Sequence, residues 1–138
     1  NLSVCGTAFF QAGAGTITIN QPANQFGSLR FVGNQVAIAQ TNNMNLQTGS
    51  SAIGQAQLAS TGGNVTITNV GGGAASFGST IAISASGSIT LPKLIQAVGT
   101  LSVTAAGTKD LSALSIASDL SGKTPSNLGT GTYIPPLP

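Results

Sequence analysis

Histidine and tryptophan are absent from this sequence of 138 residues, which also has only one cysteine, one tyrosine and two acidic residues. The single cysteine, Cys5, excludes an internal disulfide and a metal site built from cysteines. Enzymes of the usual kinds need a titratable base or an activated nucleophile, and Asp110 and Asp119 are the only acidic side chains present. We therefore expect a protein that is not an enzyme and holds no metal or cofactor. A hydrolase with paired carboxylates is the one enzymatic alternative, and two solvated corner acids are the simpler interpretation.

Charge is scarce as well, at 4% of the residues against about 25% in an average globular domain. The cations are scattered and make no basic stripe, so nucleic acid is not an expected partner. They are Arg30, Lys93, Lys109 and Lys123. The sequence has no run of about 18 apolar residues, so we expect no membrane-spanning segment. A composition so poor in charge and rich in small polar residues favours a secreted, extracellular protein.

Short alternating apolar doublets, separated by glycine, alanine, serine and asparagine, are what the sequence does contain. In an extended chain, residues two positions apart point to one face, so each doublet predicts a strand of about four or five residues. Strands this short are buried when they stack along one axis. The sequence therefore predicts an all-β fold, a solenoid of stacked short strands, with a helical turn tolerated only at residues 94–98. The inward pairs are Ile17/Ile19, Leu29/Phe31, Val36/Ile38, Met44/Leu46, Val65/Ile67, Ile81/Ile83, Ile89/Leu91 and Leu101/Val103.

The tripeptide Phe26-Gly27-Ser28 returns as Phe77-Gly78-Ser79, at an offset of 51 positions. Two degenerate copies of a unit of about 50 residues, each of two or more coils, explain this recurrence. Ile53 and Leu58 are expected to continue the inward pattern, and Thr108-Lys109-Asp110 to form a polar corner.

The amino-acid composition of the chain changes after Leu120. Residues 121–138 are rich in glycine and proline, and three of the last four residues are proline. Proline has no N–H group to donate to a strand ladder. We therefore expect a solenoid domain at residues 1–120 and a tail at residues 121–138, which serves as a linker or as a cap laid along the solenoid.

Residues 1–15 begin in apolar material and carry no charged side chain. We interpret them as an incoming coil with an open edge, through which the chain associates head-to-tail with more of the same polypeptide or with another copy. The residues assigned to this contact are Leu2, Val4, Phe9 and Phe10. Cys5 is expected to be buried as a small hydrophobe. An acylated lipoprotein cysteine is the alternative, but it requires a small residue where Val4 stands.

Polar side chains are the remaining candidates for binding. The densest group, Asn42, Asn43, Asn45 and Gln47, could hydrogen-bond sugars, and Tyr133 is the only tyrosine available for stacking. The structural alternative is that asparagines at solenoid corners satisfy backbone groups.

Four stretches resemble the repeats of filamentous-haemagglutinin-type large exoproteins, and the resemblance covers residues 15–117. They are Gly15-Thr16-Ile17-Thr18-Ile19, Ala23-Asn24-Gln25-Phe26-Gly27-Ser28, Gly63-Asn64-Val65-Thr66-Ile67-Thr68 and Leu101-Ser102-Val103-Thr104-Ala105-Ala106-Gly107. The resemblance implies a right-handed parallel β-helix that is secreted across the bacterial outer membrane with a dedicated pore partner. It further implies a surface adhesin, a biofilm component or a toxin-carrying stalk. The chain departs from that family in lacking its N-terminal secretion-domain signature.

These observations predict a non-enzymatic structural or adhesive protein, a solenoid segment that projects from the cell surface or assembles head-to-tail into fibres. Surface glycans are possible partners. The alternative is a carbohydrate-binding or ice-binding solenoid. That function requires a flat face of regular Thr-x-Thr pairs, of which Thr16/Thr18 and Thr66/Thr68 are two instances.

Overall fold

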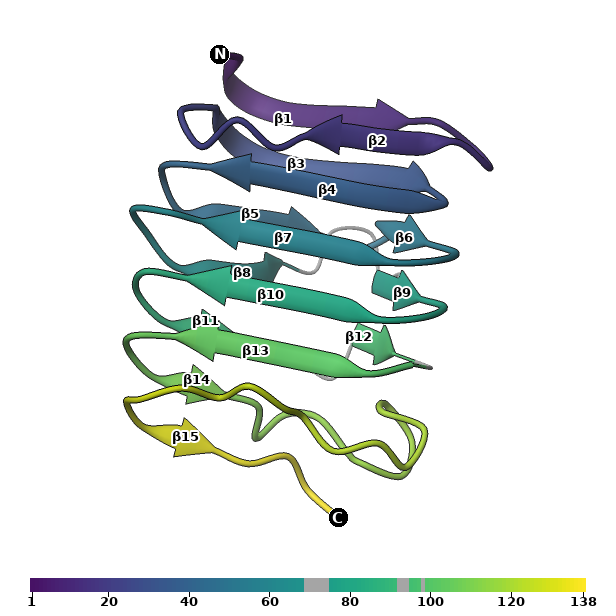
Figure 1. Cartoon of the computed structure of the whole chain (residues 1–138), viewed down its shortest axis with the longest axis vertical. Coiled ribbons are helices and arrows are strands. Elements are labelled where there is room, and N and C mark those ends of the chain that lie inside the picture. The colour runs from purple at the N-terminus through teal and green to yellow at the C-terminus, as the bar shows by residue number, and fades with distance from the viewer. Residues whose placement is uncertain (69–74, 92–94, 98) are drawn as a thin grey trace.

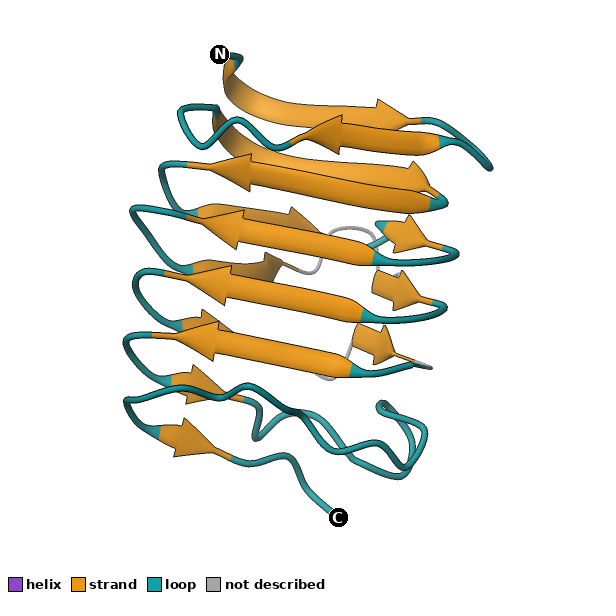
Figure 2. Ribbon diagram, in the orientation of Figure 1, coloured by secondary structure: helices purple, strands orange, loops and turns teal. Residues whose placement is uncertain are grey.

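The computed structural model describes residues 1–68, 75–91, 95–97 and 99–138, which form a β-solenoid of about six turns. All regular elements of this described part are strands, with no helix among them (Figure 2). The strands make two parallel sheets, and the two termini lie at opposite ends of the stack (Figure 1). The expected all-β parallel solenoid is thus confirmed.

As far as β13, each coil of the stack contributes first to one sheet, sheet A, and then to the other, sheet B. Sheet A contains β1 (Ser3–Gln11), β3 (Gln25–Gly33), β5 (Met44–Gln47), β6 (Ser51–Ala52), β8 (Val65–Thr68), β9 (Ala75–Phe77), β11 (Ile89–Thr90), β12 (Ile95–Ala97), β14 (Lys109–Asp110) and β15 (Tyr133–Ile134). Sheet B contains β2 (Thr16–Ile19), β4 (Gln35–Gln40), β7 (Ala56–Ser60), β10 (Ile81–Ala85) and β13 (Leu101–Ala105). In the third, fourth and fifth coils, sheet A has two short strands per coil. In the third coil, the turn at Gly49, with a φ of 83°, separates β5 from β6.

The register along sheet B shows the length of each coil. Ile38 pairs with Leu58, Leu58 with Ile83, and Ile83 with Val103, so the coil between Leu58 and Ile83 is longer than the coils on either side of it. The expected repeat unit of about 50 residues therefore corresponds to two coils. Phe26 pairs with Val4 near the start of β3, whereas the column of Phe77 passes through Ala52 to Gly33, at the end of β3. The two Phe-Gly-Ser tripeptides thus occupy different places in the coil, so their recurrence does not mark equivalent positions.

The core is a narrow column of aliphatic side chains between the two sheets. The expected inward pairs are buried, apart from Ile19, which is half-buried at the N-terminal end. The rings of Phe10 and Phe26, from the first and second coils, lie 5.6 Å apart. Those of Phe31 and Phe77, from the second and fourth coils, lie 6.3 Å apart. Alternation in the sequence therefore identified the buried face correctly.

Three local expectations were wrong, at Ile53, Cys5 and Lys109. Ile53 is 67% exposed, because it lies just after β6 where the chain turns toward sheet B. Cys5 is exposed, since it lies where the pairing of β1 with β3 is irregular. Lys109 belongs to strand β14 and is fully buried rather than placed at a corner. Within residues 94–98, the part that the structure describes is strand β12, not a helical turn.

Residues 121–138, which we call the C-terminal segment, lie along the last coil (Figure 1). Ser126 bridges to Ser102, Leu137 bridges to Ser115, and β15 pairs with β14. In the described residues, no helix is long and apolar enough to cross a membrane. The division of the chain into domains at residue 120 stays a prediction.

Candidate functional site

The predicted group of amide side chains lies where the third coil enters sheet A, and it connects this coil to its neighbours. Asn42 Nδ2 donates to the carbonyl of Phe26 at 3.2 Å, and Asn45 Nδ2 donates to the carbonyl of Gly27 at 3.0 Å. The Oδ1 of Asn43 accepts from the backbone N–H of Asn64 at 2.9 Å. These amides therefore use much of their hydrogen-bonding capacity inside the stack.

One corner position carries a column of such contacts through four coils. The backbone N–H of Ser88 donates to Asn64 Oδ1 at 2.7 Å, and that of Thr108 donates to Ser88 Oγ at 3.0 Å, which continues the contact of Asn64 with Asn43. The residues before Asn64, Ser88 and Thr108 are glycines, and a Cβ on Gly87 would overlap the Asn64 amide. We call Asn43, Asn64, Ser88 and Thr108 the corner column.

Sequence reasoning missed this column, although a signal for it was present. A glycine, a small polar residue and an inward residue recur once per coil as Gly63-Asn64-Val65, Gly87-Ser88-Ile89, Gly107-Thr108-Lys109 and Gly131-Thr132-Tyr133. The unequal length of the coils hides the recurrence from a search for a fixed period.

The outer face of sheet A carries a second set of contacts between coils. Gln47 Nε2 donates to Thr7 Oγ1 at 3.0 Å and to Ser28 Oγ at 2.9 Å, so it joins three successive coils. Thr66 Oγ1 donates to Asn45 Oδ1 at 3.0 Å. The structural interpretation of the amide group is thus supported by its geometry, and its role toward a sugar stays a prediction.

Tyr133 lies far from these amides, in β15 at the C-terminal end of the stack (Figure 1). It pairs with Lys109 and is half-buried, and burial raises the pKa of its hydroxyl. Strands β8, β11 and β14 separate β5 from β15 in sheet A. The structure therefore does not bring Tyr133 together with Asn42, Asn43, Asn45 and Gln47.

The four residues assigned to self-association belong to the first coil or just precede it. Leu2 and Phe9 are 47% and 49% exposed, and Val4 is 36% exposed. Phe10 is half-buried against Phe26, while the Arg30 guanidinium lies 4.9 Å from the ring centroid of Phe9. In the described pairing, β1 contacts only β3 and β2 contacts only β4, so both strands present a free edge at this end.

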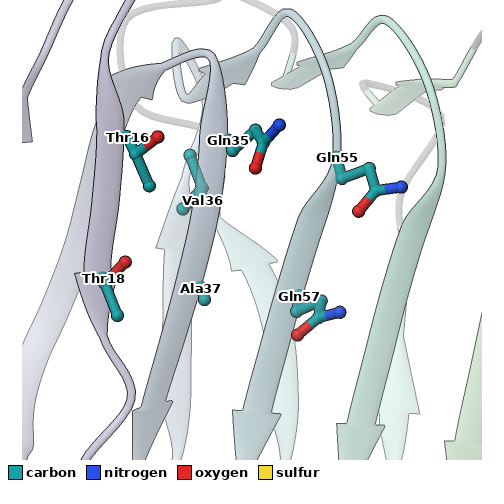
Figure 3. A pocket seen from close by; sticks show the side chains of 7 residues that line it. All are labelled: Thr16, Thr18, Gln35, Val36, Ala37, Gln55 and Gln57. Atoms are coloured by element: carbon teal, nitrogen blue, oxygen red, sulfur yellow. The ribbon is translucent and has the colours of Figure 1, made fainter.

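The outer face of sheet B differs from that of sheet A in that none of its strands carries a charged residue. Thr16, Thr18, Gln35 and Gln57 surround a shallow hollow of about 140 Å³ (Figure 3). A second hollow, of about 260 Å³, is lined by small residues of the neighbouring coils, among them Ala37, Ala39, Ala59, Ala82 and Ser84. No charged residue lines either hollow in the part of the chain that the structure describes. This face offers hydroxyl and amide groups for hydrogen bonding.

The two aspartates are engaged by different serines near the C-terminal end. Asp110 accepts from the N–H and the hydroxyl of Ser112, and these two bonds, the hydroxyl first, hold the pKa of Asp110 below its usual 3.8. Asp119 accepts from the N–H of Ser115 at 2.8 Å. Across the described ranges, no three histidine, cysteine or acidic side chains gather as a metal site would require.

Comparisons with protein-family models, with curated proteins and with solved structures each found no match.

Proposed function

We propose that this chain is a structural or adhesive extracellular protein, a solenoid segment that projects from a cell surface or assembles end to end. The observation that carries this proposal is the continuity of the contacts between coils. The polar side chains of the corner column and of the outer face of sheet A hydrogen-bond from one coil to the next. Side chains used in this way stabilise a continuous rod rather than line a binding pocket. The resemblance to filamentous-haemagglutinin-type repeats supports secretion, with a dedicated pore as a partner, and a place at the bacterial surface.

The first coil supplies the contact for end-to-end growth. Its strands β1 and β2 have free edges, and its inward Val4 leaves apolar surface exposed at the end of the core. Free strand edges add further strands readily. A head-to-tail contact of this kind builds open filaments unless the rotation closes a ring.

Sedimentation velocity and electron microscopy of the 138-residue chain test this proposal. We expect species larger than a monomer that grow with concentration, and we expect Val4→Lys to reduce them by placing a charge at the free end. Ile53→Lys is the matched control, because Ile53 is exposed on the side of the rod. A parent chain that stays monomeric at high concentration, without filaments, would refute the assembly.

Binding of a carbohydrate or of ice is the second candidate, and the outer face of sheet B favours it. That face is uncharged in its described part and presents Thr16, Thr18, Gln35 and Gln57 around a hollow. A glycan array and a polysaccharide hydrolysis panel separate the possibilities: selective binding that Gln57→Ala weakens supports a carbohydrate site. Reaction products would instead support an enzyme, and thermal hysteresis would support ice binding.

A further inference from the structure

The C-terminal segment covers the last strand of sheet B only sparsely. On its inner side, β13 pairs with β10 at five positions, from Leu101 to Ala105. On its other side, the backbone pairing among the described residues is the single bridge between Ser102 and Ser126. Two backbone hydrogen bonds belong to it: Val103 N–H to Ser126 O at 3.0 Å, and Ser126 N–H to Leu101 O at 2.9 Å. Side-chain hydrogen bonds add to this bridge: Thr104 Oγ1 donates to the carbonyl of Asn127, Asn127 Nδ2 donates to Ser102 Oγ, and Ser126 Oγ donates to the carbonyl of Leu101. Figure 1 shows this segment crossing beside β13 as a loop.

Lys109 holds this segment in place from inside the core. Its side chain is fully buried in a column that elsewhere contains Met44, Val65 and Ile89. The ammonium group donates to the carbonyls of Ala105 and Gly107 at 3.1 and 3.2 Å, and to the carbonyl of Thr130 in the C-terminal segment. A buried ammonium that loses an acceptor is costly. As long as Lys109 is present, its charge therefore favours the docked position of the segment.

The backbone of the segment is less favourable than that of the coils it covers. Ser121 and Asn127 have positive φ angles of 50° and 55°, a region that costs energy for residues with a side chain, although asparagine tolerates it. Pro125, which precedes the bridging Ser126, cannot donate to a strand ladder. A regular strand would therefore pair with the edge of β13 better than this segment does.

We propose that the C-terminal segment is a displaceable cap, held by Lys109, over an interaction surface formed by the edges of β13 and β14. The occupant of that surface is the first coil of a second copy of this chain, with its β2 beside β13 and its β1 beside β14. Strand β2 already pairs at four positions with β4 in the same sheet, so it can offer β13 more backbone pairing than the single bridge that Ser126 makes. This proposal rests on the end-to-end assembly proposed above and states what regulates it.

Hydrogen exchange of the full-length chain tests the role of Lys109. The backbone N–H groups of Val103, Leu111 and Leu137 each make a hydrogen bond between the C-terminal segment and the coil beneath it. In Lys109→Met, we expect these amides to exchange at least about 10-fold faster than in the parent, because their hydrogen bonds break when the segment opens. The amides of Val36 and Ala56, in the middle of sheet B, should keep their protection. Lys123→Met is the matched control and should behave like the parent. Unchanged exchange in Lys109→Met would overturn the proposal.

A second variant decides the question if Lys109→Met disturbs the whole stack. Ser126→Pro removes the N–H that bonds to Leu101 without touching the core, so it should release the same amides while Val36 and Ala56 stay protected. Retained protection at Val103 in Ser126→Pro would contradict the displaceable cap.

Sedimentation velocity then tests the occupant. Variants with a released segment should form particles of at least twice the parent's mass at the same concentration, and adding Val4→Lys should reverse this without restoring protection. A released segment with no gain in mass would refute the second copy as occupant. If the parent and the released variants associate equally, the end-to-end assembly stands and the regulation by the cap is refuted.

Discussion

At the scale of single residues, the core is a column in which each side chain has a fixed neighbour above and below. Ile83 lies between Leu58 and Val103 and is 1% exposed. The chain has few charges, and no described side chain in this part of the column could pair with a buried carboxylate. An acid introduced there would be desolvated without compensation.

We therefore expect Ile83→Asp, or Ile67→Asp, to lower the free energy of unfolding by about 3 kcal/mol or more. Ile83→Val, which keeps the shape and the apolar character, should cost about 0.5–1.5 kcal/mol. Denaturant unfolding followed by circular dichroism measures both. An aspartate variant that unfolds like the parent would mean that these side chains face solvent.

Asp110 gives a prediction about pH. The hydrogen bonds from Ser112 lower the pKa of Asp110 in the folded chain below the unfolded value of 3.8. The ionised carboxylate therefore stabilises the fold at pH values above 3.8, and this stabilisation is lost as the pH falls through the pKa of the folded chain. We expect an NMR titration to show the lowered pKa, and Ser112→Ala to move it back toward 3.8 by removing the hydroxyl donor. A pKa of Asp110 that Ser112→Ala leaves unchanged would contradict the hydrogen bond.

At the scale of elements, the strands are connected by corners whose polar side chains serve the next coil. Alternating apolar residues predicted the strands, because the face to which a side chain points in an extended chain depends only on its own position. The corner column could not be predicted in the same way. Its acceptors and donors, such as Asn64 Oδ1 and the Ser88 N–H, come from different coils 24 residues apart.

Gly87 tests this column, because a Cβ there would overlap the Asn64 amide. We expect Gly87→Ala to displace that amide, to leave the Ser88 N–H without its protein acceptor, and to destabilise the chain by about 1 kcal/mol. Gly6→Ala is the matched control, since nothing lies within 4 Å of the added carbon. Thermal unfolding compares the two, and equal melting temperatures would show that the column does not contribute.

At the scale of the whole molecule, the stack is a rod in which neighbouring coils contact each other. Its two ends differ. The N-terminal end presents free strand edges and the exposed side chain of Val4. The C-terminal end is covered by residues 121–138, which add β15 and two bridges. In the end-to-end assembly proposed above, the first coil of one copy meets the end of the next copy that residues 121–138 cover.

The far-ultraviolet circular dichroism spectrum should show a β-rich protein with little helix, since the described chain is entirely strand and loop. Heating should reduce this signal without passing through a helical state. A substantial helical fraction in the native chain would contradict the solenoid.

The sequence by itself determined that short strands bury alternate side chains and stack as a solenoid, because alternation and strand length are local properties. Only the tertiary structure decided which residues lie one coil apart, since coils of unequal length follow one another without a fixed period. Because of that register, Lys109 lies in an apolar column, where its ammonium group donates to the carbonyl of Thr130. The same register places Ile53 in solvent. It also separated Tyr133 from the amide group, because contacts across the coils depend on the whole length of chain between them.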